Sequence, residues 1–336
     1  MTKHTFDVIP FTAADGFEGN VWRLLHNRPK TRGPVLLVHG AGVRANIFNP
    51  PNEINLLDLL ADAGYDVFLE NWRASTEFEP NKWNLDVVAK NDHPAAVQKV
   101  CAISGSKTCK AIIHCQGSTS FMISALEGLV PEVKTIVTNA VSLHPVVPGW
   151  SKVKLDVILE MASLITDYVN PKWGDVAPDF KAKFFKALVL ATHFEKDTAV
   201  GKFVSFTYGA GFPALWELEN LTDETKDWIR GEFGAVPISF FRHIRKGVHH
   251  GSLVSLDGKK QYADHPKTDA RFIFFAGKLN KCFKSESQQR SFDYFNQLKP
   301  DFHKLHLYDA YSHLDIFLGK NAHTDIFPTM IAELNQ

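Results

Sequence analysis

The sequence predicts an α/β protein in which a mostly parallel central sheet is flanked by helices and interrupted by a helical cap insertion. Short apolar runs such as Pro34–Val38 alternate with segments of helical spacing, a pattern typical of parallel sheets covered on both faces. The alternation stops after residue 148 and resumes near residue 270. The 336 residues, 45% of them hydrophobic, suffice for one large core with an insertion. We therefore expect a core of residues 1–148 and 266–336 and a cap of residues 149–265.

The first part of the chain predicts a hairpin followed by a regular alternation of strands and helices. Residues 5–26 alternate around a turn that ends at Gly16, as two antiparallel strands do. The buried strand of residues 34–38 then runs into the turn His39–Gly42. The next expected elements are a helix at 56–63, a strand at 64–69, a helix through 95–102, a strand beginning at 110, a helix at 121–127 and a strand at 133–140.

The remainder of the chain predicts the insertion and the end of the sheet. Residues 149–265 are mostly helical in pattern and rich in aromatic side chains. Strands return at 270–276 and 304–308 and are followed by a C-terminal helix.

Composition excludes several classes of partner and cofactor. Basic and acidic residues number 37 each and form no long run of one sign, which argues against nucleic acid or an anionic membrane surface as partner. The four cysteines have neither disulfide-framework nor metal-ligand spacing, so we expect no metal and no cofactor. We find no signal-peptide pattern and no apolar segment of membrane-spanning length, and therefore expect a cytoplasmic protein without a transmembrane segment.

The stretch Lys110–Ser118 predicts an apolar strand that ends in a sharp turn with Cys115 at its tip. In the nucleophile elbow of α/β-hydrolases, the nucleophile occupies a strained strand-to-helix turn that needs small neighbours. Gly117 supplies a small residue, and residues 121–127 supply the following helix. We interpret the chain as an α/β-hydrolase fold with Cys115 as nucleophile; Ser118 is the fallback.

Acyl transfer also requires a base and a group that orients it. His313 follows the last strand, where this fold places its base, and Asn280 follows the penultimate strand, where an Asp is usual. A thiol ionises more readily than a serine hydroxyl and can form a thiolate–imidazolium pair, so a carboxylate is less necessary. We therefore expect a Cys115–His313–Asn280 triad, with Glu286 as the fallback orienting acid.

Backbone N–H groups must also stabilise the oxyanion of the reaction. The expected donors are Gln116, directly after the nucleophile, and Ala41 or Gly42 in the His39–Gly42 turn. The same turn matches a dinucleotide fingerprint with Glu70 as a distant acidic partner, but no hydride-transfer residues accompany it.

Several of these motifs together resemble the acid lipase branch of the α/β-hydrolases, which includes gastric and lysosomal lipases. The motifs are His39–Gly42, Trp83–Ala95, the elbow His114–Gly117 and the segment His313–Gly319. That branch has Ser where this chain has Cys115, and an acid where it has Asn280. The elbow of this chain, with Cys as nucleophile, is similar to the elbows of polyhydroxyalkanoate synthases and dienelactone hydrolase. The tract from the elbow through Pro148 also resembles hydrolase-like segments attached to some cholesterol oxidase relatives, which suggests a bulky apolar substrate.

The resemblance implies a hydrolase that acts on a small lipophilic ester or thioester through a covalent acyl-enzyme. Because an insertion at this point of the fold hangs over the active site, we expect an apolar pocket beneath residues 149–265. Two alternatives remain open: acyl transfer to an acceptor other than water, and a non-catalytic hydrolase-like domain that binds an apolar ligand. The sequence does not determine the oligomeric state.

Overall fold

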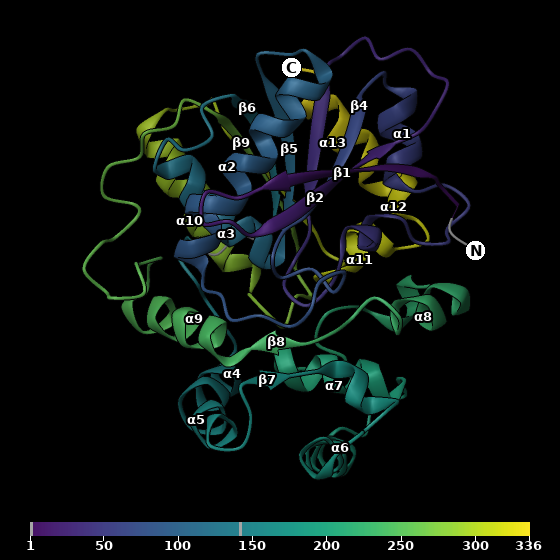
Figure 1. Cartoon of the computed structure of the whole chain (residues 1–336), viewed down its shortest axis with the longest axis vertical. Helices are drawn as coiled ribbons and strands as arrows, with labels where there is room; N and C mark the ends of the chain where they lie inside the picture. The colour runs from purple at the N-terminus through teal and green to yellow at the C-terminus, as the bar shows by residue number, and fades with distance from the viewer. Residues whose placement is uncertain (1–2, 141–142) are drawn as a thin grey trace.

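The computed structural model describes residues 3–140 and 143–336 and is built on an eight-stranded sheet (Figure 1). The strand order is β1-β2-β4-β3-β5-β6-β9-β10. The strands are β1 Phe6–Thr12, β2 Glu18–Leu24, β3 Pro34–Val38, β4 Asp66–Asn71, β5 Cys109–His114, β6 Val133–Asn139, β9 Arg271–Gly277 and β10 Lys304–Tyr308. β1 and β2 pair antiparallel, β2 joins β4 antiparallel, and all later pairings are parallel. The predicted hairpin and mostly parallel sheet are confirmed.

Helices cover the two faces of the sheet, as the pattern predicted. They are α1 Leu56–Asp62, α2 Leu85–Ser104, α3 Cys115–Leu126, α10 Ser285–Leu298, α11 Asp315–Leu318, α12 Ala322–Asp325 and α13 Phe327–Leu334. α2 begins ten residues before the predicted start at 95 because Asn84 caps it, its side-chain oxygen accepting the Val87 N–H at 3.1 Å. Every residue of β3 is buried, which explains its uninterrupted apolar sequence.

The segment between β6 and β9 forms a separate layer at the lower side of Figure 1, which we call the inserted helices (residues 149–250). They are α4 Gly149–Val153, the π-helical η2 Lys154–Ile158, α5 Leu159–Ser163, the 3₁₀ turn η3 Pro171–Gly174, α6 Phe180–Thr192, α7 Ala199–Tyr208, the 3₁₀ turn η4 Leu218–Asn220, α8 Asp223–Ile229 and α9 Ile238–His250. Two short strands, β7 Tyr168–Val169 and β8 Val236–Pro237, pair antiparallel within this layer. The sequence did not predict this small sheet.

Glu70 belongs to the core and has a partner within the protein. Its carboxylate lies 2.9 Å from His93 Nδ1, and His93 Nε2 lies 2.7 Å from Ser120 Oγ. All three side chains are fully buried and connect β4, α2 and α3. The turn after β3 continues into the short 3₁₀ helix η1 Ala45–Phe48 instead of the long helix of a dinucleotide-binding unit. Both observations count against the dinucleotide alternative.

Candidate active site

The chain forms a tight elbow between β5 and α3, with Cys115 at its apex. Cys115 has φ 57°, a left-handed conformation that a non-glycine residue adopts only when its surroundings enforce it. A Cβ on Gly117 would lie 2.1 Å from the His39 carbonyl oxygen, and one on Gly40 would lie 2.7 Å from Cys115 Cβ. The two glycines therefore allow the β3 turn to lie directly against the elbow, as the nucleophile-elbow interpretation requires.

Two backbone N–H groups point at the Cys115 sulfur. Burial raises the pKa of the Cys115 thiol to about 12, and the N–H groups of Gln116 and Ala41 act in the opposite direction. These are two of the three groups that we expected as oxyanion donors. Gly42 has φ 66°, and its carbonyl accepts the Gly234 N–H at 2.8 Å, which fixes the turn that presents Ala41.

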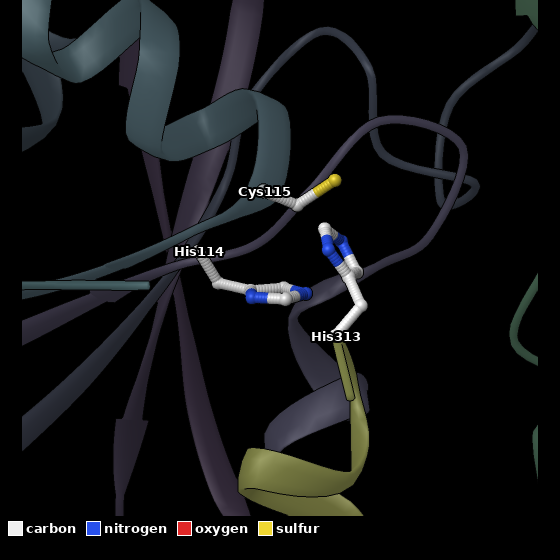
Figure 2. A group of neighbouring side chains, drawn as sticks. All are labelled: His114, Cys115 and His313. Atoms are coloured by element: carbon white, nitrogen blue, oxygen red, sulfur yellow. The ribbon is translucent and has the colours of Figure 1, made fainter. Parts of the chain in front are cut away.

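His313 follows β10 and lies beside the thiol (Figure 2). Its Nδ1 atom is 3.1 Å from Asn280 Nδ2. The orientation of the Asn280 amide follows from its other contacts. Its Oδ1 accepts the backbone N–H groups of Cys282 at 2.9 Å and Phe283 at 3.2 Å, so Nδ2 must face the imidazole. Asn280 therefore donates to Nδ1 of His313, and a neutral His313 carries its proton on Nε2.

This arrangement is the reverse of the one in a Ser-His-Asp triad. There the acid accepts the Nδ1 proton and leaves Nε2 free to act as base. Here burial, together with the neighbouring His114, holds the pKa of His313 well below its usual range. With a raised thiol pKa and a lowered imidazole pKa, the closed site favours a neutral thiol and a neutral imidazole. The thiolate–imidazolium pair expected from the sequence is disfavoured in this state.

His114 completes the cluster, although the sequence gave no reason to assign it a role. Its Nδ1 lies 2.8 Å from Asn139 Oδ1, and Asn139 Nδ2 donates to the Phe275 carbonyl at 3.1 Å. His114 thus donates from Nδ1 and has an unprotonated Nε2. Burial lowers its pKa to about 4, and its ring centroid lies 4.8 Å from that of His313.

The ligand-type atoms of His114, Cys115 and His313 lie within 4.8 Å of one another, the spacing of a possible metal centre. A metal ligand must offer an unprotonated nitrogen. His114 Nε2 meets this condition, but Nε2 of His313 does not while Asn280 donates to Nδ1. The arrangement therefore fits a proton-handling cluster better than a three-ligand metal centre.

The fallback residues lie in different surroundings. Glu286 is exposed in the first turn of α10 and makes no hydrogen bond to His313 among the described residues. Ser118 is buried in α3, and its Oγ has no hydrogen-bond partner within the described part of the chain. Tyr208, which the sequence analysis did not select, donates from Oη to the Ala41 carbonyl at 3.1 Å. The two residues are 167 positions apart, so no local pattern could have indicated this contact.

The cavity at the thiol is small. Its volume is about 10 Å³, which is about the space of one water molecule, and its walls include Tyr208, Leu215 and Phe233. A neighbouring cavity of about 50 Å³ extends from Gln116 and Cys282 into the inserted helices. The space at the thiol in this structure is therefore smaller than an ester.

The sheet and the elbow define an α/β-hydrolase fold. A monoglyceride lipase from Saccharomyces cerevisiae superposes with a TM-score of 0.63 at 15% identity, over 100% of this chain and 97% of that one. An esterase from Thermogutta terrifontis gives 0.59 at 13% identity, over 99% of this chain and 100% of that one. These likenesses establish the fold.

Sequence relatives are lipases, matched over part of their length. Human lipase member K is 32% identical over 162 residues, which cover 43% of this chain and 40% of that protein. Rat gastric triacylglycerol lipase is 32% identical over 141 residues, 36% of this chain and 35% of that protein. The chain thus matches two fifths or less of these two relatives. No protein-family model matches it.

Proposed function

We propose that this protein is a cysteine-dependent hydrolase of lipophilic carboxylic esters or thioesters. The observation that carries the proposal is Cys115 in a left-handed elbow conformation, with the N–H groups of Ala41 and Gln116 directed at its sulfur. An elbow presents a nucleophile, and two converging N–H groups stabilise the oxyanion that forms when it attacks an acyl carbonyl. The partial matches to lipases support the same class of reaction.

The chemical steps follow from the positions of these groups. The thiol proton passes to Nε2 of His313 as sulfur bonds to the acyl carbon, and the carbonyl oxygen moves between the two N–H groups. His313 then gives that proton to the leaving alcohol or thiol. Water then loses a proton to His313 and bonds to the acyl carbon, the bond from this carbon to the Cys115 sulfur breaks, and His313 returns the proton to the sulfur as the acid is released. The first step requires His313 to carry its resting proton on Nδ1, which Asn280 opposes in the closed site.

The inserted helices supply the argument for a lipophilic substrate, and we propose that they act as a cap. Leu164, Phe180 and Phe194 are each more than 80% exposed, and most other exposed large apolar side chains also lie on this layer. Such a surface is typical of a site that meets apolar ligands. No helix among the described residues is both long and apolar enough to cross a bilayer.

A non-catalytic domain that binds an apolar ligand is the second candidate, favoured by the small cavity and the neutral thiol. The hydrolase and the binding domain are distinguished by measuring hydrolysis of p-nitrophenyl butyrate and octanoate by wild type, Cys115→Ala and Cys115→Ser. Cys101→Ala, a half-buried cysteine at the far end of α2, is the matched control. We expect activity and an acyl adduct, detected by intact mass, in wild type and the control, and neither in Cys115→Ala. Equal turnover by Cys115→Ala and wild type would contradict the hydrolase proposal.

A further inference from the structure

A large cavity lies among the inserted helices, away from the triad. It has a volume of about 470 Å³, within the range of small-molecule sites. Its apolar walls include Trp150, Ile158, Leu188, Phe206 and Phe212. Nothing in the proposed mechanism uses this space.

Lys154 is the cationic side chain in the wall of this cavity. It also lines the smaller cavity that reaches Gln116 and Cys282, and it therefore lies between the outer cavity and the elbow. Its ammonium donates to the carbonyl of Gly209 and to that of Ser205 at 3.3 Å, and it lies 5.3 Å from the centre of the Phe206 ring. These contacts with α7 hold the charge at the cavity wall.

The Lys154 charge has no acidic partner in the described part of the chain. No carboxylate among the described residues lies within ion-pair distance of it, although ion pairs are frequent elsewhere in the protein. Buried charges in proteins are ordinarily paired, because an unpaired ion loses hydration without compensation. Desolvation accordingly lowers the pKa of Lys154 to about 8. An ammonium has three donors, and the two carbonyls satisfy only two of them.

The segment that carries Lys154 is itself irregular. η2 begins at Lys154 as a π-helical turn between α4 and α5, and such turns occur often at functional sites. His193 and Thr192 are the other polar side chains at the cavity wall. Burial lowers the pKa of His193 to about 4, so this ring adds no positive charge near neutral pH.

We propose that the 470 Å³ cavity binds an apolar chain that carries a carboxylate, with the Lys154 ammonium as its counter-charge. The aromatic walls pack against the hydrocarbon, and the third N–H of the ammonium donates to a carboxylate oxygen. The carboxylate belongs either to a fatty acid product or to a second acid group on the substrate. This inference extends the proposed hydrolase function to its ligand, but the binding itself does not depend on the thiol chemistry.

Calorimetric titration with dodecanoate and dodecan-1-ol, both below their aggregation limits, tests the proposal. Lys154→Met removes the charge and keeps most of the hydrocarbon, Lys154→Arg keeps a charge, and exposed Lys152→Met on α4 is the matched control. We expect Lys154→Met to weaken dodecanoate binding at least 10-fold and to leave dodecanol binding within 2-fold. Wild type and Lys152→Met should prefer dodecanoate equally. Unchanged dodecanoate affinity in Lys154→Met, or equal affinity of wild type for acid and alcohol, would overturn the proposal.

A second measurement uses wild type and avoids any folding defect of the variants. Growth with ¹³C-labelled lysine keeps all three ammonium donors, and the Lys154 Cε resonance, assigned by its absence in Lys154→Met, should shift with dodecanoate but not with dodecanol. A resonance unmoved by dodecanoate would contradict the proposal. Hydrolysis of the mono-p-nitrophenyl ester of sebacic acid and of p-nitrophenyl decanoate then identifies the source of the carboxylate. A wild-type preference for the sebacate ester that Lys154→Met abolishes indicates an acidic substrate, whereas competitive inhibition by dodecanoate alone indicates a product site. Carboxylate binding without turnover of any ester would sustain this inference and refute the hydrolase proposal.

Discussion

Asn280→Asp is the substitution that tests the site geometry most directly, and we expect it to accelerate ester hydrolysis. To accept a proton at Nε2, His313 must carry its own proton on Nδ1. In wild type this Nδ1–H would face the N–H of Asn280, whose Nδ2 is 3.1 Å away. Rotating the amide instead would remove the acceptor of the Cys282 and Phe283 N–H groups. Each route leaves buried donors unsatisfied, at about 1–3 kcal/mol per group.

The penalty for reaching the base-competent state is therefore about 2–6 kcal/mol, since two donors are affected. An aspartate at 280 removes it, because one carboxylate oxygen keeps the two backbone N–H groups and the other accepts Nδ1–H. At about 1.36 kcal/mol per tenfold change in rate, kcat/KM should rise between about 30-fold and about 25,000-fold. The opposite change, Asp to Asn in a Ser-His-Asp triad, lowers kcat about 10⁴-fold through the wrong tautomer.

The assay is kcat/KM for p-nitrophenyl butyrate between pH 4 and 9, with ¹⁵N-histidine NMR on the same samples. Because the pKa of wild-type His313 is well below its usual range, protonation of this residue should not reduce kcat/KM near pH 6. A carboxylate at position 280 raises the His313 pKa, so kcat/KM of Asn280→Asp should fall as the pH decreases through this range. Asn280→Ala, which removes the donor without adding an acceptor, should fall between the two enzymes. An Nδ1–H tautomer in wild type, or a folded Asn280→Asp no faster than wild type, would refute the reasoning.

Three further predictions concern the thiol, the oxyanion loop and the core. Alkylation of Cys115 by iodoacetamide, measured by intact mass, should be much slower at pH 7 than that of a free thiol. Its rate should rise about tenfold per pH unit up to pH 10, because only the thiolate reacts and the pKa of Cys115 is about 12. A rate that levels off near pH 8 would contradict this. Tyr208→Phe removes the hydrogen bond to the Ala41 carbonyl and should lower kcat about 10-fold with little change in KM, while urea unfolding shows a loss of about 1 kcal/mol; an unchanged kcat would mean that Ala41 is held by other contacts. Glu70→Gln disturbs the buried hydrogen bond to His93 and should lower the free energy of unfolding by about 1–3 kcal/mol, so an unchanged free energy in urea would show that this contact does not stabilise the fold.

The sequence predicted the order of the sheet elements and the elbow because both depend on local patterns. An apolar run such as Pro34–Val38 is buried on both faces, and a small residue at Gly117 is required by one close approach. Both requirements can be recognised within a few residues. The hairpin and the parallel strands agree with the structure.

The direction of the Asn280 hydrogen bond could not be predicted in the same way. An amide can donate or accept, and which atom faces His313 depends on the N–H groups of Cys282 and Phe283 in the folded turn. The role of Tyr208 depends on the packing of α7 against the β3 turn, and the short β7–β8 sheet has only two residues in each strand. Two-residue strands carry no periodicity that a sequence pattern could reveal.

The two departures from a Ser-His-Asp site are chemically linked. A serine hydroxyl beside an imidazole that donates from Nε2 would have no route to an alkoxide, whereas a thiol can ionise without a strong base. Burial is what keeps Cys115 protonated, so opening the inserted helices would return its pKa from about 12 toward the ordinary 9.0, a difference of about 4 kcal/mol. The N–H groups of Ala41 and Gln116 already point at the sulfur and would stabilise the thiolate as soon as water or substrate enters. Under the proposed mechanism, movement of the inserted helices would therefore both admit the substrate and activate the thiol.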